Sequence, residues 1–278
     1  MNEVQLRTSI EADFRQSGAD AVLYLEGKSD PDILSAILGD REQRKFAGGF
    51  IINGVFVNGL EEKRSSGSLA VISIVTVAKN SSIENVFGVI DGDGVSLPEL
   101  ASRFDAPFSG PLFTWKAYCI ENLLVKTGWP KIWGDQPDWA EEFAAYGPYV
   151  ALNRMTKEVG RALKELGIAT HTNPVLGRPL LPASEVVARL SAGKDRLLDY
   201  NVEEIFTRYV IEFQELARSG SDDVHGFLNG KWIVEHMAPR LTNRKPDQCR
   251  YEWIAHARAS GGLPEVREWW ARITGPPA

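Results

Sequence analysis

Short apolar segments alternate with amphipathic ones over the first 126 residues, and this alternation restricts the fold more than any other feature of the sequence. Residues 21–27, 85–90 and 111–117 are apolar and β-branched, which predicts buried strands. Residues 29–40 and 68–80 predict helices, the second because a crossover must connect parallel strands. This order predicts an α/β fold, with a mostly parallel, Rossmann-like sheet and helices on both of its faces.

The rest of the chain divides into one more β-rich segment and a long helical part. Residues 49–59 fit either a single strand or a hairpin that turns at Asn53-Gly54. After residue 126, apolar positions recur three and four residues apart, which is typical of amphipathic helices. We therefore expect an α/β domain over residues 1–126 and an α-helical domain over residues 127–278 that packs on it.

The composition excludes several classes of protein. Hydrophobic residues make up 44% and charged residues 24% of the 278 residues, as is ordinary for a folded soluble chain. Cys119 and Cys249 stand far apart, which excludes a disulfide framework or a cysteine zinc site. The acidic start of the chain is unlike a signal peptide, and no apolar stretch reaches the about 20 residues of a membrane span. We expect a cytoplasmic protein without a membrane partner.

Three acidic side chains directly follow predicted strands. Glu26 ends the first strand, and Asp91 and Asp93 end a later strand in the motif VIDGDG. Because ligands bind at the carboxyl ends of parallel strands, the three carboxylates converge if these two strands are neighbours. Three adjacent carboxylates repel unless a cation joins them, and their oxygen atoms suit Mg²⁺ or Mn²⁺. The alternative is that they are only turn residues, since Asp-Gly pairs often form turns.

Two other kinds of acidic motif fit the sequence less well. An EF-hand loop fails because Val95 and Ser102 stand where calcium ligands are needed. The motif VIDGDGV also fits the nucleophile motif of haloacid-dehalogenase-like phosphatases. In that family, however, the motif ends the first strand of the fold, whereas here it ends a later one. A phosphatase of this family therefore stays a less favoured alternative.

Glu26 in YLEGKSD, together with Asp91 and Asp93 in VIDGDG, resembles the TOPRIM domains of topoisomerases, primases and OLD-family nucleases. These domains carry a Glu at the end of the first strand and an Asp-x-Asp at the end of a later one. Three further segments, EGKSDPDIL, WKAYCIENLLV and HGFLNGKWIVEHM, extend the resemblance over nearly the whole chain. With them, the chain resembles OLD-like TOPRIM effectors that work beside an ABC-type ATPase in anti-phage defence, the PARIS type among them.

The resemblance implies a metal-dependent nuclease that hydrolyses phosphodiester bonds. It implies that RNA, and tRNA in particular, is the substrate, and that an ABC-type ATPase partner controls this toxic effector. In such enzymes the residue matching Glu26 acts as general acid or base or as a metal ligand, and those matching Asp91 and Asp93 hold Mg²⁺ or Mn²⁺. The alternative is an interaction module that docks on an ATPase and whose acidic site is weak or vestigial.

Further site residues come from the same resemblance. Glu121 is a candidate ligand for a second metal ion, and Lys231 is a candidate to neutralise the phosphate charge in the transition state. Asn122, Asp30 and Lys28 are supporting residues. The position of Asp30 favours a cap of the helix that follows it over a metal ligand, and Asn122 can also act only as a cap.

Basic residues in the helical part are candidates for binding the substrate. Arg154, Lys157 and Arg161 recur three and four residues apart and could face a phosphate backbone. Glu158 and Glu165 on the same stretch favour a solvated, salt-bridged face instead. The net charge is −6, so a nucleic-acid enzyme needs a local basic surface. A homodimer that pairs two such surfaces would meet that need, and we expect one in the active form.

Overall fold

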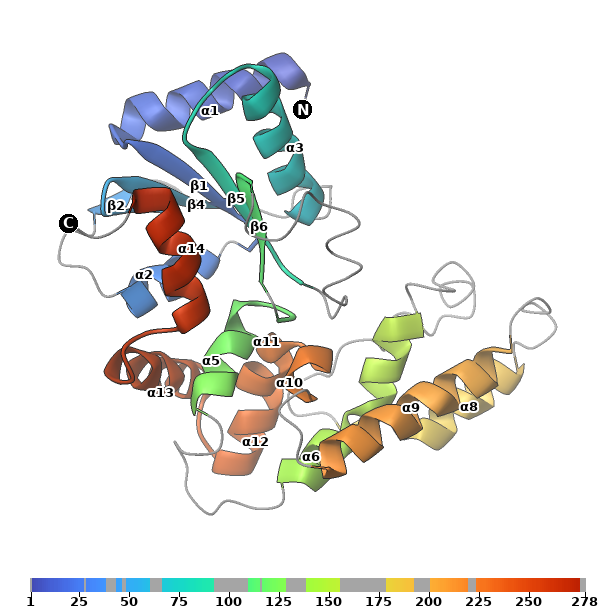
Figure 1. Ribbon diagram of the computed structural model, residues 1–278. Helices are drawn as coiled ribbons and strands as arrows, with labels where there is room; N and C mark the ends of the chain where they lie inside the picture. The colour runs from blue at the N-terminus through green and yellow to red at the C-terminus, as the bar shows by residue number, and fades with distance from the viewer. Residues whose placement is uncertain are drawn as a thin grey trace. The chain divides into compact units, whose positions relative to one another are not determined.

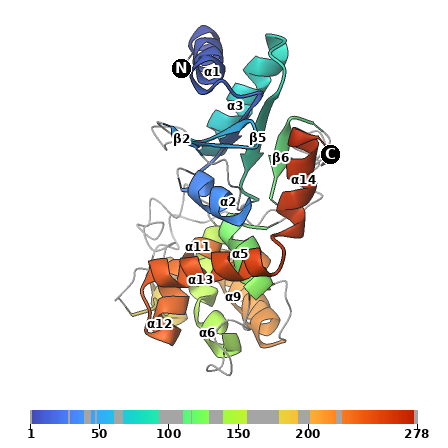
Figure 2. The same ribbon diagram turned by 90° about the vertical axis from the view of Figure 1, so that its left-hand side faces the viewer.

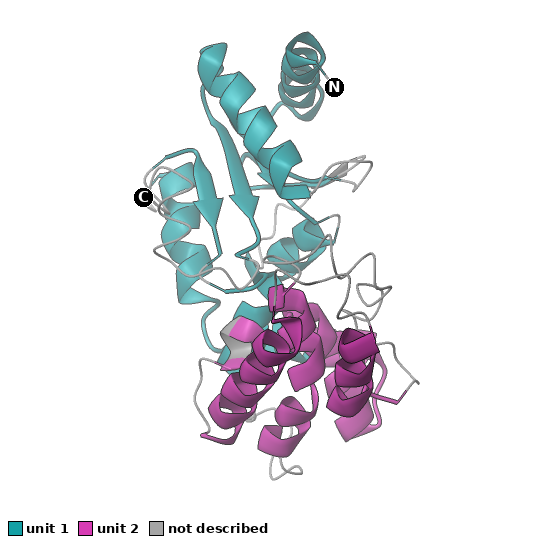
Figure 3. Cartoon of the chain, turned by 90° about the vertical axis from the view of Figure 1, so that its right-hand side faces the viewer, with its two compact units in different colours: residues 1–128, 251–278 teal, residues 129–250 magenta. Residues whose placement is uncertain are grey.

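The chain consists of two compact units, which Figure 3 distinguishes by colour. Our computed structural model describes residues 2–27, 29–38, 44–46, 49–60, 67–92, 110–115, 117–128, 139–155, 179–192, 201–219 and 224–275, of which 44–46, 225 and 226 by backbone alone. The first unit contains residues 1–128 and 251–278, and the second contains residues 129–250. The expected division differs from this one, because it assigned residues 251–278 to the helical domain.

A six-stranded sheet forms the centre of the first unit, with the strand order β2-β3-β4-β1-β5-β6. The strands are β1 (Ala21–Leu25), β2 (Arg44–Phe46), β3 (Gly49–Ile52), β4 (Val55–Gly59), β5 (Val86–Ile90) and β6 (Leu112–Thr114). β4, β1, β5 and β6 run parallel, whereas β3 is antiparallel to both β4 and β2. The expected α/β fold with a mostly parallel, Rossmann-like sheet is confirmed (Figure 1).

Helices cover both faces of this sheet. Those of the first unit are α1 (Glu3–Ser17), α2 (Asp30–Leu38), α3 (Gly67–Asn80), α5 (Ile120–Gly128) and α14 (Pro264–Thr274), and α13 (Pro246–Ala259) crosses the boundary between the units. Val22 and Tyr24 of β1 pack in one cluster with Ile10 of α1 and Val71 of α3. Figures 1 and 2 show α1 and α3 on one side of the sheet and α14 on the other.

Local sequence signals explain where several elements begin and end. Asn2 and Gln5 form a reciprocal capping box at the start of α1, and Gly18 ends this helix with φ 63°. The hairpin alternative for residues 49–59 is confirmed, since β3 and β4 are joined by Asn53 and Gly54. Their φ values of 48° and 74° are those that Asn and Gly adopt most readily in a two-residue hairpin turn.

The packing of α14 explains why the end of the chain belongs to the first unit. The indole ring of Trp269 is 6.0 Å from the ring of Phe113 in β6 and 5.4 Å from that of Trp115. Trp269 is fully buried by these contacts. The periodicity of residues 264–274 predicts a helix with an apolar face, but it does not say which surface that face covers.

All the secondary-structure elements described in the second unit are helices, as the sequence predicts. Its elements are α6 (Trp139–Ala145), a helix through residues 147–155, α8 (Ala183–Ala192), α9 (Val202–Arg218), α10 (Val224–Phe227), α11 (Gly230–Trp232), the π-helical turn η3 (Ile233–Met237) and α12 (Ala238–Thr242). Leu152, Val186 and Phe206 lie at the centre of its core. None of the helices described in either unit is long and apolar enough to cross a membrane.

The π-helical turn lies next to the proline of α12. The amide N–H of Ala238 donates to the carbonyl of Ile233, five residues earlier, instead of four. Pro239 follows directly; it has no N–H, and its ring would clash with the carbonyl four residues before it in a regular α-helix. The wider turn accommodates this proline and keeps residues 230–242 helical.

Candidate functional site

The two strands that end in acidic residues are neighbours in the sheet. β1 and β5 pair in parallel, with Leu25 opposite Val89. The carboxylate of Glu26 therefore reaches the turn after β5, where its Oε2 atom accepts a hydrogen bond of 3.0 Å from the amide N–H of Asp91. The sequence-based prediction depended on these two strands being neighbours, and the sheet meets that condition.

The pair lies at a topological switch point of the sheet. After β1 the chain continues to strands on the β4 side, whereas after β5 it continues to β6 on the opposite side. The connections that leave β1 and β5 thus run to opposite sides of the boundary between these two strands. In open α/β sheets, ligands bind in the crevice that such divergence opens at the carboxyl ends of the strands. Glu26 and Asp91 stand on either side of that point.

The first residue of α3 packs directly against Glu26. A Cβ atom at Gly67 would lie 2.6 Å from Cγ of Glu26 and 2.9 Å from its carbonyl oxygen, so a larger residue does not fit there. The half-buried carboxylate of Glu26 consequently lies beside the N-terminal end of a helix of 14 residues. The start of α3 and the Asp91 amide thus both contact this side chain and hold it in place.

Asp30 stabilises the backbone that follows Glu26. Its Oδ2 atom accepts a hydrogen bond of 3.0 Å from the amide of Gly27, and its own amide donates to the carbonyl of Gly27 at 3.2 Å. The Asp30 side chain is only 1% exposed, and a Cβ at Gly27 would lie 2.5 Å from its Oδ1 atom. Asp30 thus supports the position of Glu26. Lys28 lies outside the described residues.

The turn after β5 is confined on its other side by the chain that leaves β6. The amide of Trp115 donates to the carbonyl of Ile90 at 3.2 Å, so the strand pairing reaches the residue before Asp91. A Cβ at Gly92 would lie 2.2 Å from the carbonyl oxygen of Ala117 and 2.7 Å from that of Trp115. Only glycine fits at this position. Asp93, the second acid of the motif, lies outside the described residues.

The two candidates of α5 have different environments. The side chain of Asn122 accepts hydrogen bonds of 3.1 Å from both the amide and the Sγ atom of Cys119. Asn122 therefore caps the start of α5, in the manner of a capping box. Glu121 is 0% exposed in the first turn of the same helix, where a carboxylate needs a cation or hydrogen-bond donors. It follows β6, the strand next to β5, in the same unit as Glu26.

The oxygen ligands at this edge fit the chemistry of Mg²⁺ or Mn²⁺. The Glu26 carboxylate is within hydrogen-bond distance of the main-chain amide of Asp91, and sequence places Asp93 two residues further. Among the described residues, no three His, Cys, Asp or Glu side chains form a group that could hold a metal ion. The described part of the donor set thus consists of two carboxylates.

The remaining sequence-based candidates belong to the second unit. Lys231 is half-buried in α11, and its amide donates to the side chain of Asn229 at 2.9 Å. The guanidinium group of Arg154 pairs with Glu212 at 3.2 Å and lies 4.0 Å from the centre of the Tyr209 ring. Arg154 therefore pairs with a carboxylate of α9, whereas Glu158 and Glu165, the partners that the sequence suggested, lie outside the described residues. Lys157 and Arg161 lie outside the described residues.

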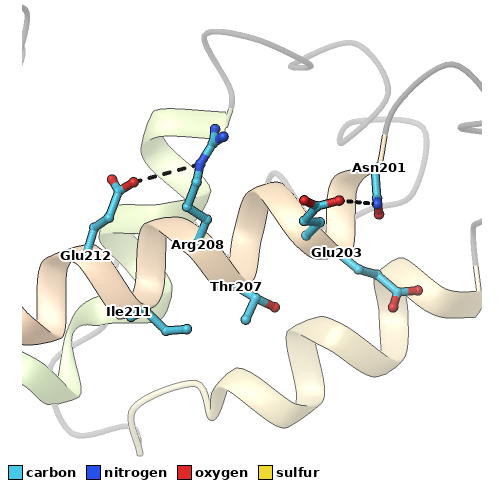
Figure 4. A pocket seen from close by; sticks show the side chains of 7 residues that line it. Asn201, Glu203, Thr207, Arg208, Ile211 and Glu212 are labelled. Atoms are coloured by element: carbon cyan, nitrogen blue, oxygen red, sulfur yellow. Dashed lines mark hydrogen bonds and ion pairs between the residues drawn. The ribbon is translucent and has the colours of Figure 1, made fainter.

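A shallow pocket on the outer face of α9 is a separate feature that the sequence did not suggest (Figure 4). Asn201, Glu203, Glu204, Thr207, Arg208, Ile211 and Glu212 line it. Arg208 and Glu212 form an ion pair of 3.8 Å, and Asn201 donates to Glu204. These partners are neighbours on one helix, so they stabilise α9 itself and do not define a binding chemistry.

Comparison with known proteins returned no match: no protein-family model, no curated protein and no solved structure matches this chain. The residues at the strand ends that sequence reasoning missed are Gly67, Gly92 and Trp115. Gly92 had a visible signal, since it separates the two acids of the motif. Gly67 and Trp115 carry no such signal, because their importance depends on contacts across the sheet.

Proposed function

We propose that this chain is a metal-dependent nuclease of the TOPRIM type, which hydrolyses phosphodiester bonds of RNA, with tRNA as the expected substrate. The observation that supports it most is the hydrogen bond from the Asp91 amide to Glu26 at the switch point between β1 and β5. The motifs predict an acid pair at one edge of a sheet, and the boundary between β1 and β5 is where open α/β sheets bind ligands, which supports the proposal.

The roles of the residues follow from this geometry. Asp91 and Asp93 would hold the metal ion, which polarises a substrate phosphate and lowers the pKa of a water molecule when it is bound. Glu26 is ordered by the Asp91 amide and by the start of α3, so it is suited to be a metal ligand or to accept a proton from the attacking water. We assign Glu121 to a second metal ion and Lys231 to charge neutralisation at the phosphate, as the resemblance implies.

The biological setting of the proposal comes from the motifs that extend beyond the TOPRIM segment. They resemble effectors such as the AriB nuclease subunits of PARIS systems. By that resemblance we propose a cytoplasmic toxin that acts in abortive infection, that is held inactive by an ABC-type ATPase and that forms a homodimer when active. A gene for an ABC-type ATPase next to the gene for this chain would support the setting.

A cleavage assay tests the enzymatic proposal. The purified chain is incubated with tRNA, and separately with DNA, in Mg²⁺, in Mn²⁺ and in EDTA. We expect cleavage of tRNA with either metal and none in EDTA. Glu26→Gln should reduce the rate by about 10² to 10⁴, the range that general acid–base groups contribute. Glu84→Gln is the matched control, because Glu84 is exposed and lies before β5.

Three outcomes would change or refute parts of the proposal. Cleavage of DNA but not of tRNA would retain the nuclease and change its substrate. If neither nucleic acid is cleaved, with the chain either alone or released from an ATPase partner, the nuclease proposal fails. The interaction module is then favoured, and a binding assay with the ATPase replaces the cleavage assay. Equal rates for Glu26→Gln and Glu84→Gln would also refute the role of Glu26.

A further inference from the structure

Helix α14 packs against the end of β6, and the chain that leaves β6 confines the turn at Asp91 and Gly92. Figure 2 shows α14 beside β6, and Trp269 of α14 contacts Phe113 of β6. Trp269 contacts Trp115 edge-on, with ring centroids 5.4 Å apart and an interplanar angle of 60°. It also contacts Phe113, whose ring stacks on Phe87 of β5 at 6.3 Å. Trp269 therefore completes an aromatic layer that spans β5 and β6.

Trp115 connects this layer to the acidic turn. Its side chain is buried against Trp269, while its main chain pairs with Ile90 and places a carbonyl oxygen against Gly92. A glycine in close contact with backbone carbonyl groups cannot move toward them. The position of Trp115 thus limits the path of the chain at Asp91 and Gly92.

We infer that Trp269 is a positioning residue for the carboxylate site. By holding Trp115, it determines where the chain after β6 lies and, through that chain, how Asp91 is presented to Glu26. The importance of Trp269 for catalysis rests on the proposed function, whereas its effect through Trp115 on the position of Asp91 does not. The site at the strand ends consequently depends on a helix more than 170 residues away in the sequence, since 264 − 91 = 173.

Trp270 provides a matched control. It is the next residue of α14, it is 6% exposed, and among the described residues its ring contact is with Trp269, at 5.7 Å. The Nε1 atoms of both tryptophans are buried without a hydrogen-bond partner in the described part of the chain. Substitution of either by Phe therefore removes packing volume and no hydrogen bond. Of these two tryptophans, Trp269 is the one whose ring contacts Trp115.

The experiment compares Trp269→Phe with Trp270→Phe in the full-length chain without metal. Hydrogen–deuterium exchange is measured by mass spectrometry on peptides that cover residues 86–92 and 112–117. We expect severalfold faster exchange at both peptides in Trp269→Phe, and exchange close to that of the unsubstituted chain in Trp270→Phe. Mn²⁺ titration should show about tenfold weaker binding in Trp269→Phe alone, the usual effect of disturbing residues behind a ligand.

The outcomes separate this inference from the proposed function. Equal exchange at residues 86–92 in the two variants would overturn the inference, whatever the metal results are. If the exchange differs as expected but the unsubstituted chain binds no Mn²⁺ and cleaves nothing, the positioning contact stands and the proposed function fails. If Trp269→Phe does not fold, Trp115→Phe tests the same contact from the other side. Unchanged exchange at residues 86–92 in Trp115→Phe would also overturn the inference.

Discussion

Replacement of Gly88 in β5 by Ala should loosen the packing of α3 on the sheet. A Cβ atom at this position would lie 2.5 Å from Cγ1 of Val71, 2.8 Å from Cγ2 of Val75 and 3.2 Å from Cδ1 of Leu112. Carbon atoms in favourable contact are about 3.5 to 4.0 Å apart, so the overlap with Val71 is about 1 Å. The same helix begins at Gly67 beside Glu26, so its position also matters for the site.

The two valines cannot move aside easily, which determines the size of the effect. β-branched side chains in a helix have one strongly preferred χ1 rotamer, so the methyl groups of Val71 and Val75 are held in place. Overpacking of a core by one methyl group destabilises proteins by about 1 to 3 kcal/mol. The reduced entropy of the unfolded chain with Ala returns about 0.4 to 1 kcal/mol. We expect Gly88→Ala to lower the free energy of unfolding by about 1 to 2 kcal/mol.

A double-mutant cycle with Val71→Ala tests this reasoning. Val71→Ala removes the closest methyl group but leaves Cγ2 of Val75 2.8 Å from the new Cβ atom, so in its presence Gly88→Ala should cost less but remain destabilising, with a coupling energy of about 1 kcal/mol. Urea unfolding with a constant m-value provides the free energies. Val77→Ala is the control: Val77 is also buried in α3 but is not among the nearest neighbours of Gly88, so that cycle should be additive. Additivity in the Val71 cycle would refute the steric account.

Single substitutions test three other contacts of the first unit. Burial raises the pKa of Asp13 above its ordinary value of 3.8, and the hydrogen bond donated by the Tyr24 hydroxyl offsets part of that shift. The stability that Asp13 contributes is present below 3.8 and is lost as the pH rises through its higher folded pKa. The free energy of unfolding of Asp13→Asn should therefore increase relative to that of the unsubstituted chain as the pH rises through the folded pKa of Asp13. Urea unfolding at several pH values measures this, and a difference between the two proteins that does not change with pH would contradict it. Asn122→Ala removes the acceptor of the Cys119 amide and should lower the free energy of unfolding by about 1 kcal/mol, as loss of a helix cap does; no change in the urea midpoint would show that the cap is unimportant. Gly92→Ala would place a Cβ 2.2 Å from a carbonyl oxygen, so it should abolish metal-dependent cleavage with an unchanged circular dichroism spectrum, and full activity would refute the close approach.

The candidate site was only partly predictable from the sequence, because some of its residues act through local contacts and others through contacts with distant segments. Glu26 and Asp91 follow apolar runs that read as strands, so the rule on strand ends could place both acids at one edge of the sheet. Asp30 and Asn122 have local roles, and both roles were among the alternatives that their positions suggested. Gly67 and Trp115 were missed. Each matters through an atom of a distant residue, and no local pattern contains that information.

The sequence by itself determined the secondary structure of most elements and the edge at which the acids lie. Periodicity, caps and turn residues act over a few positions, so the identities of neighbouring residues are enough to predict them. The tertiary structure alone decided that β1 and β5 are neighbours, that α14 returns to the first unit, and that Gly92 is enclosed by the chain after β6. These facts depend on which apolar surfaces bury one another. Many pairings satisfy the same hydrophobic pattern, and only shape complementarity between distant segments selects one of them.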